Sequence, residues 1–162
     1  FIFSYLTGGM NFIDISNLKP ENISDNRLTY TRQKTGKTIN IQLSTDANRI
    51  IDIYSQVTKT TGYIFPILKM NNHITAQQKQ NRVHKLLLET NEGLKHIARL
   101  CGIKSNLTTY VARHSFATVL KNSGVNISLI GELLGHSDFA TTQIYLDSFD
   151  NVQCTDAMKH LV

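Results

Sequence analysis

The sequence predicts a mainly helical α+β domain that carries one small antiparallel sheet. Apolar residues recur at the three- to four-residue spacing of amphipathic helices over most of the chain. Alternation with a period of two is confined to residues 22–43, and short turn-forming strings interrupt it there. With 162 residues and 41% hydrophobic residues, the chain can bury a core within one domain.

The N-terminal half is expected to hold two short helices followed by the sheet. Residues 1–18 are apolar, Gly8-Gly9 interrupts them, and Pro20 ends the pattern. Residues 22–43 contain three strand-like pieces separated by "SDN" and "KTGK", and the second turn has a glycine suited to positive φ. A helix capped by Ser44 should follow, with one apolar face formed by Ala47, Ile50, Ile51, Tyr54 and Val57.

The C-terminal half is expected to be helical after a short extended link over residues 62–68. A helix over 75–101, with Gly93 as a possible dividing point and Gly102 as its end, should bury Val83, Leu86, Leu87, Leu94, Ile97 and Ala98. Three more helices should cover 108–121, capped by Thr108 and closed by Gly124, then 127–134, closed by Gly135, and then 138 to beyond Tyr145. A weak helix near 155–161 would end the chain.

Charge and composition narrow the function. Seventeen Lys and Arg against twelve Asp and Glu give a net charge of +5 and a pI near 9.3, which favours a polyanionic partner such as nucleic acid. No apolar run approaches the roughly 18 residues of a membrane span, and no signal peptide is visible, so we expect a cytoplasmic protein with no membrane partner. The spacing of Cys101, Cys154 and the six His fits no metal site, so we expect ordinary thiols, no metal and no cofactor.

Two strings place chemically useful side chains at the ends of expected helices. "YVARHSFAT" holds Tyr110 and Arg113 three residues apart, and so on one face of a helix. "LLGHSDFATTQIYL" puts His136 and Tyr145 at the two ends of one helical segment. Singly, each has an ordinary structural explanation: a packed Tyr, a capping His, an ion-paired Arg. Their joint order and spacing favours a site.

A third string, "RQKTG", holds Arg32 and Lys34 two residues apart, so on a strand they would point to the same side. Arginine offers paired donors that fit phosphate oxygens. A phenol needs its proton removed or its charge stabilised before it can attack, and a lysine at a leaving oxygen can donate a proton. These parts are sufficient for attack on a phosphodiester in which fixed positive charge replaces a metal ion.

In combination these strings resemble the catalytic domain of tyrosine recombinases of the phage-integrase type. The resemblance rests on the spacing of Arg113, His136 and Tyr145, on the strings LGHS and TT-x-x-YL, and on "RQKTGK", which is similar to the β-hairpin lysine segment of that family. "NEGLKHIA" also fits integrases of mobile and conjugative elements. The resemblance covers essentially all of residues 1–162, and it implies a C-terminal catalytic domain from which an N-terminal DNA-clamping domain is absent.

The resemblance also implies a mechanism and partners. Tyr145 would attack a scissile phosphate, forming a 3′-phosphotyrosyl link and freeing a 5′-hydroxyl that Lys34 would protonate. Arg113 and His136 would hold the non-bridging oxygens, and neither ATP nor metal would be needed. Tyr110 stands where the family has a His, and we expect it to be a hydrogen-bond donor in the site or a packing residue. Four protomers would act on double-stranded DNA, whereas the fragment alone should bind weakly and could be monomeric.

The chain departs from the family in "TGGMNFIDI" (7–15), where Gly8 or Met10 stands at the position of the family's first Arg. We hypothesise that Arg32 substitutes for it. Asp14 is expected to fix the local helix turn. DNA contact is expected from a basic surface that comprises Arg32, Lys34, Lys37, Lys69, Lys79 and Arg82.

Two alternatives have no chemistry. Residues 126–145 also resemble a helix-turn-helix with Gly135 in the turn, in which Thr141, Thr142 and Gln143 would reach base edges. The missing first Arg could instead mark a decayed recombinase that only binds DNA. Only the enzyme hypothesis predicts a covalent adduct through Tyr145.

Overall fold

The computed structural model describes residues 1–137 and 139–146, with the backbone alone for residues 139 and 144–146. The predicted class, mainly α with a small antiparallel sheet, is confirmed. The elements, in chain order, are α1 (Ile2–Leu6), α2 (Phe12–Ser16), the 3-10 turn η1 (Pro20–Asn22), β1 (Ile23–Ser24), β2 (Arg27–Thr31), β3 (Thr38–Gln42), α3 (Thr45–Thr58), α4 (Ala76–Leu100), α5 (Thr109–Asn122), α6 (Ile127–Leu134) and α7 (Phe139–Leu146).

The sheet has the order β1-β2-β3 with both pairs antiparallel. Asp25 and Asn26 join β1 to β2 with φ of 49° and 59°, the signs that a two-residue type I′ hairpin requires. The longer loop between β2 and β3 begins after the Thr31–Thr38 pair and contains Gly36 at φ +68°. This second loop is the part of the sheet that reaches the site.

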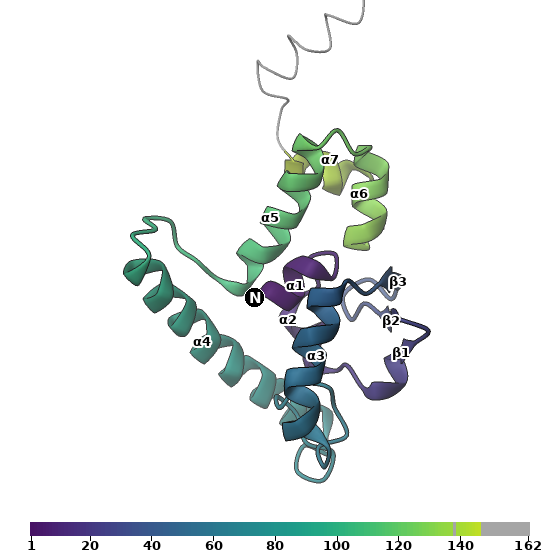
Figure 1. The fold of residues 1–162 in the computed structure, drawn as a ribbon, viewed down its shortest axis with the longest axis vertical. Coiled ribbons are helices and arrows are strands. Elements are labelled where there is room, and N and C mark those ends of the chain that lie inside the picture. The colour runs from purple at the N-terminus through teal and green to yellow at the C-terminus, as the bar shows by residue number, and fades with distance from the viewer. Residues whose placement is uncertain (138, 147–162) are drawn as a thin grey trace, which may run out of the picture.

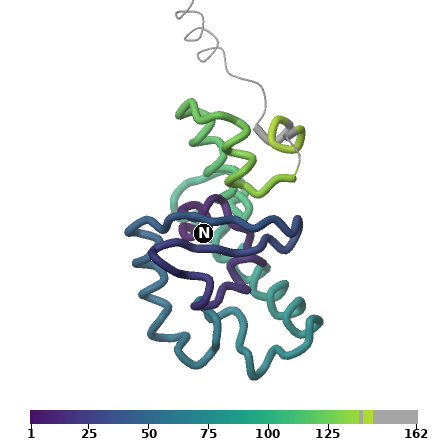
Figure 2. Tube along the Cα trace, turned by 90° about the vertical axis from the view of Figure 1, so that its right-hand side faces the viewer, coloured from purple at the N-terminus to yellow at the C-terminus, as the bar shows by residue number. Residues whose placement is uncertain are grey.

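The described residues form three hydrophobic cores, one of them around Tyr63, Leu68 and Val83; the other two lie as follows. The larger core lies among the sheet, α1, α2 and α3, and the smaller one lies between α5 and α6, around Ala117, Ile130 and Leu134. Helices α5, α6 and α7 form one end of the molecule, whereas the end of α3 and the start of α4 lie at the other (Figure 1). The strands run across the middle, next to the α5–α7 end (Figure 2). The β2–β3 loop therefore meets α6 at the boundary between the two cores.

Most helix ends lie where the sequence predicts them. The side chain of Ser44 accepts a hydrogen bond from the backbone N–H of Ala47, and Thr75 forms a capping box with Gln78. Gly102 and Gly135 have φ of +68° and +66° just beyond α4 and α6. These are left-handed residues that end helices at little cost because they lack a Cβ.

Several local expectations are wrong. Gly93 does not divide α4, which runs unbroken to Leu100, and Ile97 on that helix is 52% exposed rather than buried. Thr108 precedes α5, but its side chain makes no capping hydrogen bond. The 62–68 link is a series of bends and turns, because four of its side chains are folded inward: Tyr63, Ile64, Phe65 and Leu68.

None of the helices above is both long and apolar enough to span a bilayer. Groups of three or more His, Cys, Asp or Glu that could hold a metal ion are not found in the described residues. Cys101 is an exposed free thiol. Cys154 and the helix expected near 155–161 lie outside the described residues.

Candidate active site

Two buried guanidinium groups meet at the C-terminal end of α6. Arg113, from α5, is 2% exposed and donates from Nη1 to the carbonyl of Gly9 at 2.9 Å and from Nη2 to the carbonyl of Leu134. Arg32, from the β2–β3 loop, is 5% exposed and donates from Nη1 to the carbonyl of Gly135 at 2.7 Å. The last carbonyls of a helix carry partial negative charge, so this position favours both cations.

Two glycines allow this approach. A Cβ on Gly9, which has φ +66°, would lie 2.9 Å from both Cα and Cγ of Arg113. A Cβ on Gly135 would lie 2.6 Å from Cδ1 of Ile39 and 3.1 Å from Cδ of Arg32. At Gly9 the near atoms include the backbone of Arg113, so glycine is needed there for steric as well as conformational reasons. At Gly135 the end of the Ile39 side chain could shift, and the positive φ of +66° is the stronger requirement for glycine.

Asp14 is a buried carboxylate whose pKa both arginines affect. Its Oδ1 accepts the backbone N–H of Gln33 at 2.9 Å, which ties α2 to the β2–β3 loop. We expected the Asp14 side chain to fix its own helix turn, whereas this hydrogen bond links α2 to a different element. Burial raises the pKa of Asp14, against the opposing effects of the Gln33 hydrogen bond, Arg32 and Arg113.

Among the described residues, this cluster contains two guanidinium groups, Arg32 and Arg113, and one carboxylate, Asp14. The Nε of Arg32 is buried and has no hydrogen-bond partner among the described residues. A buried donor without a partner is costly, and native proteins seldom leave one. The cluster is therefore suited to a bound anion.

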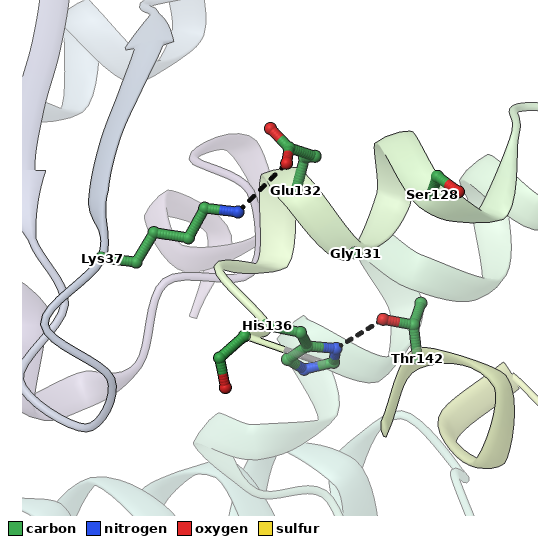
Figure 3. A pocket seen from close by; sticks show the side chains of 7 residues that line it. Lys37, Ser128, Gly131, Glu132, His136 and Thr142 are labelled. Carbon is green, nitrogen blue, oxygen red and sulfur yellow. Dashed lines mark hydrogen bonds and ion pairs between the residues drawn. The ribbon is translucent and has the colours of Figure 1, made fainter. Parts of the chain in front are cut away.

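His136 lies directly after the left-handed Gly135, and its main chain is fixed by an N–H bond to the carbonyl of Gly131 at 2.9 Å. Its Nδ1 is 2.9 Å from Oγ1 of Thr142 on α7. Figure 3 shows this hydrogen-bonded pair in the wall of a cavity of about 500 Å³ that Lys37, Ser128, Gly131, Glu132, His136, Ser137 and Thr142 line. His136 connects this cavity to the arginine cluster, because it follows Gly135, whose carbonyl binds Arg32.

Burial is the largest cause that lowers the pKa of His136 to about 4, followed by the charges of Arg113, Arg32, Lys34 and Lys37. The imidazole is therefore neutral at neutral pH, with one N–H and one lone pair on its ring. A neutral His adds no charge to the cluster, but it can donate or accept one proton in a hydrogen bond.

The β2–β3 loop supplies the lysines, but not as the sequence predicted. Because β2 ends at Thr31, Arg32 and Lys34 lie in the loop, where Arg32 is buried and Lys34 is exposed. The expectation that they share one face of a strand is wrong. Lys37 forms an ion pair with Glu132 on α6, at 3.2 Å from Nζ to Oε1 (Figure 3).

The remaining predicted residues lie at varying distances from this cluster. Tyr110 begins α5 and is 50% exposed, with its ring edge-on to that of His114 at 4.7 Å. Position 145 lies on α7, but the side chain of Tyr145 is outside the described part of the structure. Lys69, Lys79 and Arg82 belong to the start of α4 and the turn before it, at the end of the molecule opposite α6 and α7 (Figure 1).

Two contacts of the site were not predicted from the sequence: that of Thr142 with His136 and that of Glu132 with Lys37. The string TT-x-x-YL contained Thr142, but only its side-chain contact reveals what it does. Thr142 is 0% exposed and is bound to His136. It cannot reach a base edge from that position, so the helix-turn-helix alternative is wrong for this residue.

The model of the phage integrase family matches residues 3–151. The tyrosine recombinase XerD of Proteus mirabilis is 40% identical over 88 residues, which are 54% of this chain and 24% of XerD. XerD of Pseudomonas putida is 50% identical over 52 residues, 32% of this chain and 17% of that protein. The matches thus span a quarter or less of these relatives.

Solved structures with the same fold include XerA recombinase, with a TM-score of 0.69 and 20% identity over 98% of this chain and 56% of that chain. The Tn1549 transposon integrase in complex with a circular intermediate DNA gives a TM-score of 0.71 at 15% identity, over 98% of this chain and 56% of that chain. XerH bound to its palindromic difH substrate gives 0.69 at 19% identity, over 96% and 42%.

Proposed function

This chain belongs to the phage integrase family, and from that premise we propose that it catalyses site-specific DNA recombination by cutting and rejoining strands through a phosphotyrosine. The proposal also concerns the intact protein, because the chain spans just over half the length of the solved relatives, 56% for XerA. The observation that carries it is the pair of buried guanidinium groups, Arg32 and Arg113, beside a neutral His136.

The cluster suits a phosphodiester in its charge and its hydrogen-bond donors. Guanidinium groups bind phosphate oxygens through charge-assisted hydrogen bonds, and a buried site strengthens them. The Nε of Arg32, unpartnered in the described residues, is a donor ready for one such oxygen. Because these donors are already fixed by the Leu134 and Gly135 carbonyls, they would stabilise developing charge without rearrangement.

In the proposed reaction, the Tyr145 hydroxyl releases its proton to solvent water as its oxygen attacks phosphorus, and the bond from phosphorus to the 5′-oxygen breaks. Arg113, Arg32 and His136 bind the non-bridging oxygens. Lys34, exposed on the β2–β3 loop, gives its proton to the departing 5′-oxygen. The phosphotyrosyl bond keeps the energy of the phosphodiester, so that a 5′-hydroxyl from a second strand can reverse the attack. Tyr110 would add a hydrogen-bond donor at the rim of the site.

We propose double-stranded DNA as the partner, bound by four protomers acting together. Solved relatives carrying DNA support the first part, among them the lambda integrase dimer bound to a core site. Lys34 and Lys37 would contact DNA beside the cut. Lys69, Lys79 and Arg82 lie at the opposite end, so they would contact only DNA that extends well beyond it.

The deciding experiment is a covalent-adduct assay. The intact protein is incubated with nicked DNA from the ends of its own element, beside Tyr145→Phe, and run on a denaturing gel. A slow band that is lost in the variant supports the proposal. No adduct, with salt-sensitive DNA binding by both proteins, would instead identify a relative that has lost cleavage together with its first Arg.

A further inference from the structure

A buried hydroxyl connects the candidate catalytic His to the helix that carries Tyr145. Oγ1 of Thr142 lies 2.9 Å from Nδ1 of His136, and Thr142 is 0% exposed. The contact depends on a glycine, because a Cβ on Gly131 would lie 2.6 Å from that same Oγ1. Gly131 thus leaves room on α6 for α7 to bring the hydroxyl against the imidazole (Figure 3).

The direction of this hydrogen bond follows from the needs of the hydroxyl. Among the described residues, His136 is the hydrogen-bond partner of the Thr142 side chain. If Nδ1–H donated to Oγ1, the buried hydroxyl proton would lack an acceptor, and an unsatisfied buried donor costs about 1–3 kcal/mol. If the hydroxyl donates to Nδ1, its proton is satisfied. The ring proton of a neutral imidazole then belongs on Nε2.

We propose that Thr142 is a positioning residue, which holds His136 as the Nε2–H tautomer and so presents an N–H donor to the scissile phosphate. This deepens the proposed function and rests on it. The main-chain bond from His136 to Gly131 fixes the backbone, and the Thr142 bond fixes the ring about its remaining torsions.

The contact also couples two parts of the reaction. Position 145 is three residues after Thr142, and therefore on the same side of α7. An α7 that left its place against α6 would remove the Thr142 hydroxyl from His136 and carry the nucleophile position away in the same movement. The donor and the nucleophile are set in place together.

The test compares Thr142→Val, which keeps the shape but removes the hydroxyl, with Thr142→Ser, which keeps the hydroxyl. Adduct formation by the intact protein on nicked DNA should fall roughly ten- to a hundredfold in the Val variant, the range seen when a partner that orients a ligating His is lost. It should recover largely in the Ser variant. Far-UV circular dichroism and urea unfolding check that both variants fold.

A second readout does not require activity. Nitrogen chemical shifts of the His136 ring, assigned with His136→Gln in protein labelled at histidine, report which nitrogen is protonated. Wild type and Thr142→Ser should show a protonated Nε2, whereas Thr142→Val should show a tautomer mixture. A protonated Nδ1 in the wild type, or an unchanged tautomer and rate in Thr142→Val, would overturn the inference. If wild type forms no adduct, the proposed function fails, and the ring shifts still decide this inference.

Discussion

The substitution Arg32→Met tests whether Arg32 replaces the family's missing first arginine. Methionine keeps most of the buried stem of the side chain and removes its charge and all its donors. The Gly135 carbonyl keeps the hydroxyl of Thr35 as a donor at 3.2 Å. The change therefore removes the guanidinium without leaving that carbonyl unsatisfied.

The expected effects on stability and on rate are unequal. Loss of the 2.7 Å charge-assisted bond to Gly135 would cost about 1.5–3 kcal/mol in stability. Against this, the change removes one of two buried cations that lie close together, so the net loss in free energy of unfolding should be below about 2 kcal/mol. The cleavage rate should fall about 10²- to 10³-fold, or roughly 2.7–4 kcal/mol in activation free energy, as for a lost transition-state donor.

The assay is single-turnover cleavage of nicked DNA, with urea unfolding in parallel. Arg32→Lys should be intermediate, because lysine keeps the charge but cannot reproduce the paired donors. Lys34→Ala serves as the control for loss of the proton donor. If Arg32→Met cleaves at the wild-type rate while Lys34→Ala does not, Arg32 has no role at the phosphate and the reasoning from the buried guanidinium pair is wrong.

Three further predictions use no substitution at Arg32. Gly9→Ala should lower the free energy of unfolding by more than about 2 kcal/mol, because it adds a clash with Arg113 to the strain of a left-handed backbone. Gly36 has a similar φ, but a Cβ added there would meet no described atom within 4 Å, so urea unfolding of Gly36→Ala should show a smaller loss. The pKa of His136, about 4, lies below its ordinary 6.5. Between these values the unfolded chain binds a proton that the native chain does not, so the free energy of unfolding should fall as pH falls from 6.5 to 4. Denaturation of His136→Gln across the same window should show a weaker pH dependence, and an equal one would contradict this assignment. The rate of adduct formation should be unchanged in excess EDTA. A rate that depends on added divalent metal would show that the charges of Arg32, Arg113 and Lys34 are not sufficient for cleavage.

Local signals were enough to predict most of the fold. Helix ends depend on neighbouring residues, so Ser44, Gly102 and Gly135 identified them from sequence alone. The buried turns of residues 62–68 were missed because an apolar run has no periodicity that separates an extended link from one folded inward. Ile97 was assigned to the core from helix spacing, whereas its side chain is 52% exposed among the described residues.

The site was predictable in its residue types but not in its contacts. The spacing of Arg113 and His136 is local to the C-terminal half, and the sequence reveals it. The placement of Arg32 is set by where β2 stops and by its approach to the Gly135 carbonyl, which no strand pattern contains. Thr142 had no signal of its own, because its role depends on the space left by Gly131 on another helix.

The bonds that hold the two arginines join distant parts of the chain. Arg113 binds a carbonyl 104 residues away, and Arg32 binds one 103 residues away. During synthesis the β2–β3 loop leaves the ribosome long before the end of α6, so neither guanidinium has its full set of partners until almost the whole described chain has emerged. Contacts of such long sequence separation form late in folding. An unfinished chain would therefore lack the arginine cluster, and the activity proposed for it would have to wait until the end of α6 has been made and folded.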